Sequence, residues 1–242
     1  MTRIIRNENI TRKRKTKIHF PKQTAKGVKR DMTKELNAFF KELKKHPIDK
    51  VICLDETSIH PGLSINYAKC KLGRRCIEKT DNNEIFRKYT LVVAISNNKL
   101  VASKFYDKGG MNSERLIELL KNDILKNKKG YLLLMDNARA HKSDAVKQYI
   151  KESENHILYL VPYQHYLNPV EEYFNQLKHY IKVDKPMTKE ALKKSVSKSL
   201  PKIKKKDYEG YYNHAFNKSK LKQKETKKST LYRKPKIYKN KS

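Results

Sequence analysis

Short apolar runs alternate with polar stretches through the middle of the chain. Three runs rich in Val, Ile and Leu indicate buried strands, at residues 50–56, 131–135 and 157–161. Between the first two, the segments 89–95 and 100–106 flank Asn97-Asn98 and predict a β-hairpin. These segments together predict five strands.

Apolar residues at helical spacing separate these strands. The expected helices begin near Thr33, Ser113, Ser143, Asn168 and Thr188, and the last one ends before Pro201. On the helix after Asn168, the apolar face is formed by Val170, Phe174, Leu177 and Ile181. The order of strand, hairpin, helix, strand, helix, strand and helix predicts an α/β layer with a mixed sheet.

The chain divides into four expected regions. Residues 1–45 are a basic arm or linker with one helix, and residues 46–185 form the main α/β domain. Residues 186–216 are a helical extension whose aromatic cluster packs back on that domain. Residues 217–242 are a Lys-rich tail, expected to be disordered until DNA binds it.

Charge narrows the class of partner. The sequence holds 57 Lys and Arg against 25 Asp and Glu, a formal net charge of +32. Such an excess favours a polyanion, and nucleic acid is the commonest one. No apolar run approaches the roughly 20 residues that span a bilayer, and the N-terminus lacks the apolar core of a signal peptide. We therefore expect an intracellular protein at DNA, in a prokaryotic cytoplasm or nucleoid or in a eukaryotic nucleus.

Three acidic residues lie at the ends of predicted elements. Asp55 and Asp136 end two strands that could be neighbours, and Glu171 lies in the first turn of the helix that Asn168 caps. Hard oxygen ligands suit Mg²⁺, and two such ions can promote cutting of a phosphodiester. Like charges would repel at close range without a cation, so the three acids predict a divalent-metal site.

Each acid also has a purely structural interpretation. Asp55 could cap the loop after its strand, which would leave Glu56 as the functional acid. Asp136 could form a turn with Asn137. Glu171 lies three positions after Asn168, where a Glu can close a capping box. That role does not exclude metal binding.

Several basic residues could contact phosphate, although each alone could equally be a solvated charge. His141 could orient a carboxylate or contact phosphate. The cluster at positions 12–15 could be a solvated arm, a DNA contact or a nuclear import signal. The candidate DNA-binding residues are Arg12, Lys13, Arg14, Lys15, Arg74, Arg75, Arg139, Lys142 and Lys178.

Two motifs resemble the DDE transposases of the IS630/Tc1/mariner superfamily. Residues 136–141, Asp-Asn-Ala-Arg-Ala-His, match the superfamily pattern D-N-A-x-x-H. Residues 167–171, Leu-Asn-Pro-Val-Glu, match L-N-P-I-E, with Phe174 where Trp is usual. Positions 136 and 171 leave 34 residues between them, the spacing typical of Tc1-like members. Weaker similarity at residues 54–57 and 211–215 extends the resemblance over roughly residues 45–216.

The resemblance implies an RNase H-like fold and a transposase that excises and inserts DNA. It implies that Asp55, Asp136 and Glu171 are catalytic and bind two Mg²⁺ or Mn²⁺ ions. Glu172 is the alternative to Glu171, and Asn137 and His141 would support the site. The expected partners are transposon ends and target DNA, bound by a homodimer.

The sequence departs from the superfamily pattern in two places. Gln164-His165-Tyr166 stands where the superfamily usually has Ser-Pro-Asp or Pro-Glu. Only about 45 residues precede the matched region, where helix-turn-helix modules are usual. We therefore keep open a truncated, non-catalytic DNA-binding remnant that regulates a full-length transposase. A host nuclease of RNase H or junction-resolving type is the third hypothesis, against which the L-N-P-x-E motif speaks.

Overall fold

The structure, a computed structural model, describes residues 27, 29–65, 69, 75–77 and 82–217 of the 242-residue chain. Several sequence predictions lie outside these residues. They are the basic cluster from Arg12 to Lys15, the candidate Arg74 and the C-terminal tail from residue 218.

A five-stranded mixed sheet forms the centre of the molecule, in the order β3-β2-β1-β4-β5. The strands are β1 (Val51–Ile59), β2 (Tyr89–Ile95), β3 (Leu100–Tyr106), β4 (Leu132–Met135) and β5 (His156–Tyr159). β1, β2 and β3 pair antiparallel, whereas β4 pairs parallel with β1 and β5 pairs parallel with β4. The predicted mixed sheet and the hairpin of β2 and β3 are confirmed.

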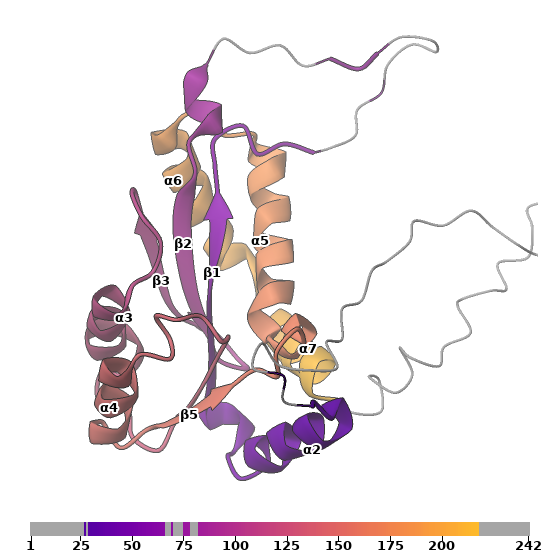
Figure 1. The fold of residues 1–242 in the computed structure, drawn as a ribbon. Helices are drawn as coiled ribbons and strands as arrows, with labels where there is room; N and C mark the ends of the chain where they lie inside the picture. Colours follow the sequence, from indigo (N-terminus) through magenta and orange to yellow (C-terminus); the bar gives the residue numbers. More distant parts are fainter. Residues whose placement is uncertain (1–26, 28, 66–68, 70–74, 78–81, 218–242) are drawn as a thin grey trace, which may run out of the picture.

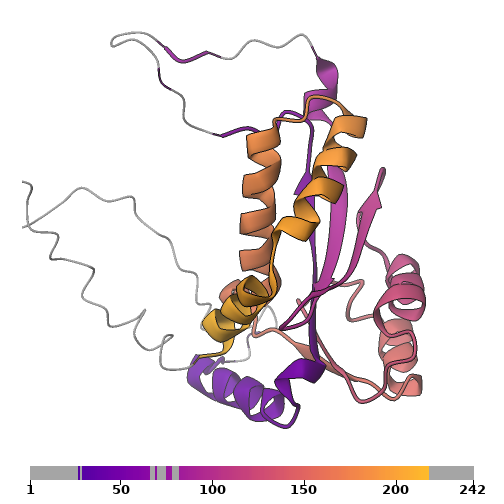
Figure 2. The ribbon, with the colours of Figure 1, turned by 180° about the vertical axis from the view of Figure 1, so that it is seen from behind.

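Helices cover both faces of this sheet (Figure 1). They are α2 (Met32–Leu43), α3 (Ser113–Leu119), α4 (Asp144–Glu152), α5 (Pro169–Asp184), α6 (Lys189–Ser199) and α7 (Lys205–Phe216). Short helical turns are η1 (Ile48–Lys50), η2 (Asn83–Phe86), η3 (Leu120–Ile124), η4 (His165–Leu167) and η5 (Leu200–Lys202). Figure 2 shows α5 and α6 on the face opposite α3 and α4. Among the described residues, no helix has both the length and the apolar character needed to cross a bilayer.

Side-chain caps explain where these helices begin. The predicted caps Ser143, Asn168 and Thr188 each accept a hydrogen bond from a backbone N–H of the first turn. Two predicted caps were one or two residues too late, because Asp31 caps α2 and Asn112 caps α3. The helix starting near Ser113 continues past Leu119 as the π-type turn η3.

The two faces of the sheet carry separate apolar cores. Val51 and Cys53 on β1 pack toward α5 and α7, whereas Ile52 and Leu54 pack toward α3 and α4. A strand buried on both faces explains the uninterrupted apolar run. The aromatic residues of α7 belong to the first core, so the predicted packing of the C-terminal cluster against the domain is confirmed.

Two strand boundaries differ from the prediction. β1 does not end at Glu56 but continues to Ile59, because its antiparallel pairing with β2 runs on to the pair Ile59↔Tyr89. Asp55 therefore lies within a strand rather than at its end. β5 covers His156–Tyr159 instead of 157–161, and the chain leaves the sheet after Tyr159 while Leu160 and Val161 remain buried.

Candidate active site

Strand pairing places the two aspartates side by side. β1 pairs with β4 through Cys53↔Leu134, and continuing that register by two residues sets Asp55 beside Asp136. Neighbouring strands lie about 4.8 Å apart. Asp136 follows the last residue of β4, where the chain turns away from the sheet. Both carboxylates therefore reach the same region from adjacent strands.

The start of α5 brings the third acid to this region. Asn168 caps the helix, with Oδ1 accepting from the Val170 N–H, and its Nδ2 donates to Asp55 Oδ2 at 2.8 Å. This hydrogen bond joins residues 113 positions apart and holds the first turn of α5 against β1. Glu171 lies in that first turn. From the sequence we predicted only a capping role for Asn168. The signal that could have shown its second role is the L-N-P motif, which places an amide donor three residues before Glu171.

Asp55 is the most perturbed acid of the group. Burial, followed by the nearby charges of Asp136 and Glu171, raises the pKa of Asp55 to about 7. A hydrogen bond from the Glu56 N–H to Oδ1 at 2.7 Å and the charge of His141 oppose this rise. The raised pKa reflects a carboxylate held in a half-buried position next to two others.

His141 supports Asp136. The His141 Nδ1 lies 2.6 Å from Asp136 Oδ1, which also accepts the Ala138 N–H at 2.9 Å. The bond from His141 is the main reason that the pKa of Asp136 is lowered. Burial opposes a charged imidazole, but the hydrogen bond and the charge of Asp136, helped by Asp55, outweigh it and raise the pKa of His141. Tyr159 Oη donates to the His141 carbonyl at 2.8 Å and fixes this turn.

The neighbouring acids point to other partners. Glu56 is exposed, and its Oε2 accepts the Met111 N–H at 3.1 Å. Glu172 forms an ion pair of 3.0 Å with His214 of α7. These contacts favour Asp55 over Glu56 and Glu171 over Glu172 as members of the cluster.

Hydrogen bonds also show whether α5 has a capping box and what the Asn137 side chain contacts. The capping box of α5 is not formed, because the Asn168 N–H donates to the His165 carbonyl instead of to Glu171. Asn137 Nδ2 donates to the Leu160 carbonyl at 2.6 Å, so this side chain ties together the chain segments that leave β4 and β5.

The predicted phosphate-binding residues are distributed unevenly. Lys178 lies two turns after Glu171 on α5. Burial lowers the pKa of Lys178, and the negative charge of Glu171 opposes that lowering. Lys142 interacts with the charge of Asp136 and has its Nζ 5.2 Å from the centre of the Tyr159 ring. Arg139 is exposed in the same turn. Arg75 is exposed in the short described piece 75–77.

The donor set suits a hard divalent cation. Asp55, Asp136 and Glu171 offer only oxygen ligands, as Mg²⁺ and Mn²⁺ prefer. In the described part of the chain, no three His, Cys, Asp or Glu side chains are already drawn together tightly enough to hold a metal ion. Each Asp55 oxygen accepts one hydrogen bond, and both described bonds of Asp136 end on Oδ1. Side-chain rotation is therefore needed to bring the three acids onto one ion.

Comparison with known proteins identifies the family and the fold. The family model described as DDE superfamily endonuclease matches residues 50–193. The structure is similar to the Mos1 strand transfer complex, with a TM-score of 0.71 and 14% identity over 89% of this chain and 66% of that one. It is also similar to a pre-cleavage Mos1 transpososome, with a TM-score of 0.70 and 15% identity over 89% of this chain and 67% of that one.

The catalytic domain of Mos1 mariner transposase is similar over 75% of this chain and 84% of that one, with a TM-score of 0.56 and 15% identity. No curated protein matches the sequence. The chain spans about two thirds of the Mos1 chains in the larger complexes. At these identities the likeness concerns the fold, which is RNase H-like.

Proposed function

This chain belongs to the DDE superfamily of endonucleases, and on that premise we propose that it is a transposase that cuts DNA and joins the freed ends to a target. The family match confirms the resemblance that the two sequence motifs indicated. The observation that carries the proposal is the hydrogen bond from Asn168 to Asp55. It brings the helix bearing Glu171 to the strand pair bearing Asp55 and Asp136.

We assign the binding of divalent cations to Asp55, Asp136 and Glu171. Mos1 structures with Mn and with Mg support such cations, and two Mg²⁺ or Mn²⁺ ions are our proposal for this chain. Bound there, the cations would lower the pKa of the attacking hydroxyl and stabilise the leaving 3′-oxygen. His141 holds Asp136 in its ionised form, and Asn168 orients Asp55.

The proposed reaction has two steps. In the first, a water oxygen attacks the phosphorus at the end of the element and the bond from phosphorus to the 3′-oxygen breaks, leaving a 3′-hydroxyl and a 5′-phosphate. In the second, this 3′-hydroxyl attacks a target phosphodiester, and the target strand leaves with its own 3′-hydroxyl. The side chains of Asp55, Asp136 and Glu171 would orient the reacting groups around the phosphate.

Positive charge would hold the DNA. Lys142 and Lys178 interact with the charges of Asp136 and Glu171, and exposed Arg139 lies in the same turn as Lys142. Arg75, Arg74 and the cluster at residues 12–15 would add phosphate contacts without reading bases. Paired-end complexes of Mos1 support transposon ends as ligands. A homodimer on DNA is our further proposal for this chain. A protein with this substrate would work inside the cell at DNA.

Strand cleavage by purified protein tests the proposal. We expect nicking of duplex DNA that carries the element's ends, dependent on Mg²⁺ or Mn²⁺, and its loss in Asp136→Asn. Glu172→Gln is the matched control, because the Glu172 side chain is half-buried and pairs with His214. This variant should retain most activity. DNA binding without any metal-dependent cleavage would instead identify a non-catalytic regulator.

A further inference from the structure

A second charged cavity lies at the far end of β2 and β3, and it contains none of the residues assigned above. Its volume is about 430 Å³. Tyr89 at the start of β2 and Tyr106 at the end of β3 form part of its wall. Five charged residues complete the lining of this cavity, called here the Arg87 pocket: Arg87, Asp107, Lys108, Arg115 and Lys189.

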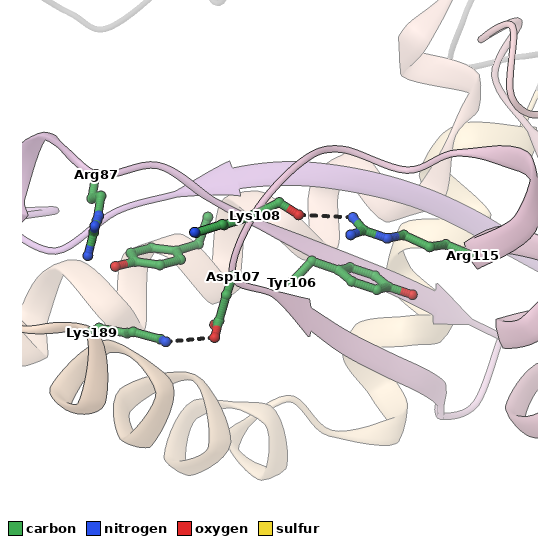
Figure 3. A pocket seen from close by; sticks show the side chains of 7 residues that line it. Arg87, Tyr106, Asp107, Lys108, Arg115 and Lys189 are labelled. Carbon is green, nitrogen blue, oxygen red and sulfur yellow. Dashed lines mark hydrogen bonds and ion pairs between the residues drawn. The ribbon is translucent and has the colours of Figure 1, made fainter.

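The lining carries four cationic side chains and one carboxylate. Asp107 does not neutralise them, because it is shared by Lys189 at 2.6 Å and by the neighbouring Lys193 at 3.2 Å. Arg115 is fixed by hydrogen bonds to the carbonyls of Lys108 and Gly110. Figure 3 shows the charged ends of Arg87, Lys108 and Lys189 around the space beside Asp107. An anion would be attracted to this space.

The wall of the pocket also holds a donor that lacks a partner. Tyr89 is only 3% exposed, and its ring packs against Phe105 with centroids 5.3 Å apart. Among the described residues, nothing forms a hydrogen bond with the buried Tyr89 Oη. The Tyr89 hydroxyl lies near the ammonium group of Lys189. Buried polar groups usually have partners, so an anionic oxygen bound in the pocket would satisfy this donor.

The Arg87 pocket is connected to the candidate active site. The segment after β3 lines the pocket with Asp107 and Lys108 and then donates the Met111 N–H to Glu56, next to Asp55. Tyr89 pairs with Ile59, four residues along β1 from Asp55, which corresponds to about 13 Å along the strand. Duplex DNA rises about 3.4 Å per base pair. A duplex whose axis runs parallel to β1 would have a phosphate level with the pocket about four base pairs from the acids.

We propose that the Arg87 pocket binds a backbone phosphate of the DNA substrate about four base pairs away from the bond that is cut. The inference rests on the proposed function, because that function supplies DNA as the ligand. Arg87, Lys108 and Lys189 provide the charge, and the Tyr89 hydroxyl provides an oriented neutral donor. Contacts of this kind set the register of DNA on a protein without reading its sequence.

Equilibrium binding of duplex DNA in EDTA tests the pocket separately from catalysis. Fluorescence anisotropy over a series of KCl concentrations would compare wild type with Arg87→Gln/Lys108→Gln and with Tyr89→Phe. The matched control for charge is Lys126→Gln/Lys151→Gln, which removes two exposed lysines beyond α3 and on α4. We expect the pocket pair to weaken binding about three- to tenfold and to reduce the salt slope by about 1, with a clearly smaller change in the control.

Tyr89→Phe gives a readout that a purely structural tyrosine would not give. Because none of the described residues forms a hydrogen bond with this hydroxyl, its removal should leave the melting temperature unchanged or raise it, while DNA affinity falls. Unchanged affinity in Tyr89→Phe, with the Arg87 and Lys108 pair behaving like the lysine control, would overturn the inference. Failure of wild type to bind DNA at all would instead contradict the proposed function.

Inorganic phosphate distinguishes a free anion from a DNA backbone. If phosphate raised the melting temperature of wild type but not of the pocket variants, while DNA affinity was equal in all of them, the pocket would be a free-phosphate site. That result would also overturn the inference. Competition between millimolar phosphate and DNA that disappears in the pocket variants would support it.

Discussion

The surroundings of Asp55 disfavour its negative charge. Burial and the neighbouring acids raise its pKa to about 7, from 3.8 for an ordinary aspartate. The folded state therefore binds the Asp55 proton more tightly than the unfolded chain does. This tighter binding of the proton stabilises the folded protein. The stabilisation is complete below the pKa of Asp55 in the unfolded chain and is lost as the pH rises through about 7. Above that pH, the molecule stores unfavourable electrostatic energy at the site that a cation would relieve.

Replacing Asp55 with Asn should therefore stabilise the metal-free protein. We expect Asp55→Asn to raise the free energy of unfolding by roughly 1–3 kcal/mol at about pH 8, with a smaller gain at about pH 5. The loss of one accepted hydrogen bond limits the gain. Urea unfolding at both pH values measures it, with the exposed Asp123→Asn as control. Equal effects at the two pH values would show that Asp55 is not under electrostatic strain. Cleavage should be lost in this variant.

His141 should contribute stability that also falls as the pH rises, because its pKa too is raised in the folded protein. Its pKa is raised above 6.5, so the pairing with Asp136 is complete below the unfolded pKa and is lost as the pH rises through the folded pKa. We expect His141→Ala to destabilise the protein by about 1–3 kcal/mol, more at about pH 6 than at about pH 9. Thermal unfolding would detect this, and the exposed His179→Ala should show no such dependence.

At the scale of elements, α5 combines structural and chemical roles at its first turn. Pro169 occupies a position where no amide is needed, and Asn168 caps the helix. The partial positive charge of a helix N-terminus favours carboxylates such as Glu171. The same Asn168 side chain donates to Asp55. The helix start therefore serves as the support of the site.

Two substitutions of Asn168 should separate capping from positioning. Asn168→Asp keeps an acceptor for the Val170 N–H but replaces the donor to Asp55 with a negative charge. We expect a loss of stability that grows as the pH rises and a pH profile of DNA cleavage displaced to higher pH, because a nearby anion raises the pKa of Asp55 further. Asn168→Ala should cost about 1 kcal/mol of stability through the lost cap. An unchanged pH profile in Asn168→Asp would contradict the positioning role.

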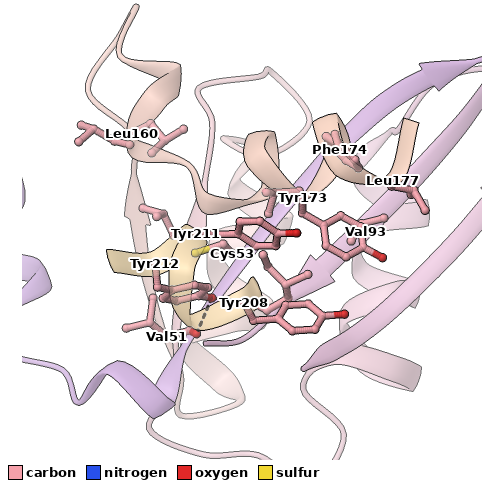
Figure 4. Close-up of a cluster of buried hydrophobic side chains, with 14 of the residues drawn as sticks. Val51, Cys53, Val93, Leu160, Tyr173, Phe174, Leu177, Tyr208, Tyr211 and Tyr212 are labelled. Carbon is pink, nitrogen blue, oxygen red and sulfur yellow. Dashed lines mark hydrogen bonds between the residues drawn. The ribbon is translucent and has the colours of Figure 1, made fainter. Parts of the chain in front are cut away.

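At the scale of the whole molecule, the C-terminal helix completes the core. Tyr212 of α7 is buried, and its Oη donates to the carbonyls of Val51 and Ile95 on β1 and β2 at 3.0 and 2.8 Å. Figure 4 shows Tyr208, Tyr211 and Tyr212 packed with Tyr173 of α5. The family match ends at residue 193, before this helix. We therefore propose that residues 186–216 are an integral layer of the catalytic domain of residues 46–185.

A truncated chain and two tyrosine substitutions test whether residues 186–216 are part of the folded domain. We expect residues 46–193 alone to lack a cooperative unfolding transition, whereas residues 27–217 show one. Tyr212→Phe should cost about 1–3 kcal/mol, because two buried carbonyls lose their donor. Tyr173→Phe in the same core is the matched control, since its hydroxyl is buried without a partner among the described residues. Urea denaturation followed by circular dichroism would measure both, and equal losses would argue against the role of Tyr212.

The sequence by itself determined the local elements and the chemistry of the candidate site. Alternating apolar residues and turn residues placed β2 and β3, and short polar side chains placed the starts of α4, α5 and α6. These features depend on neighbours within a few residues, so periodicity and capping rules recover them. The two spaced motifs also identified the family.

Only the tertiary structure decided what depends on residues far apart in the chain. The length of β1 followed from its pairing with β2, and the anchor between Asn168 and Asp55 spans 113 positions. The Arg87 pocket assembles residues from β2, β3, α3 and α6. Such contacts are set by strand register and helix packing, which local propensity does not encode. Their energies, including the raised pKa of Asp55, arise only when burial removes water from charges that the fold has brought together.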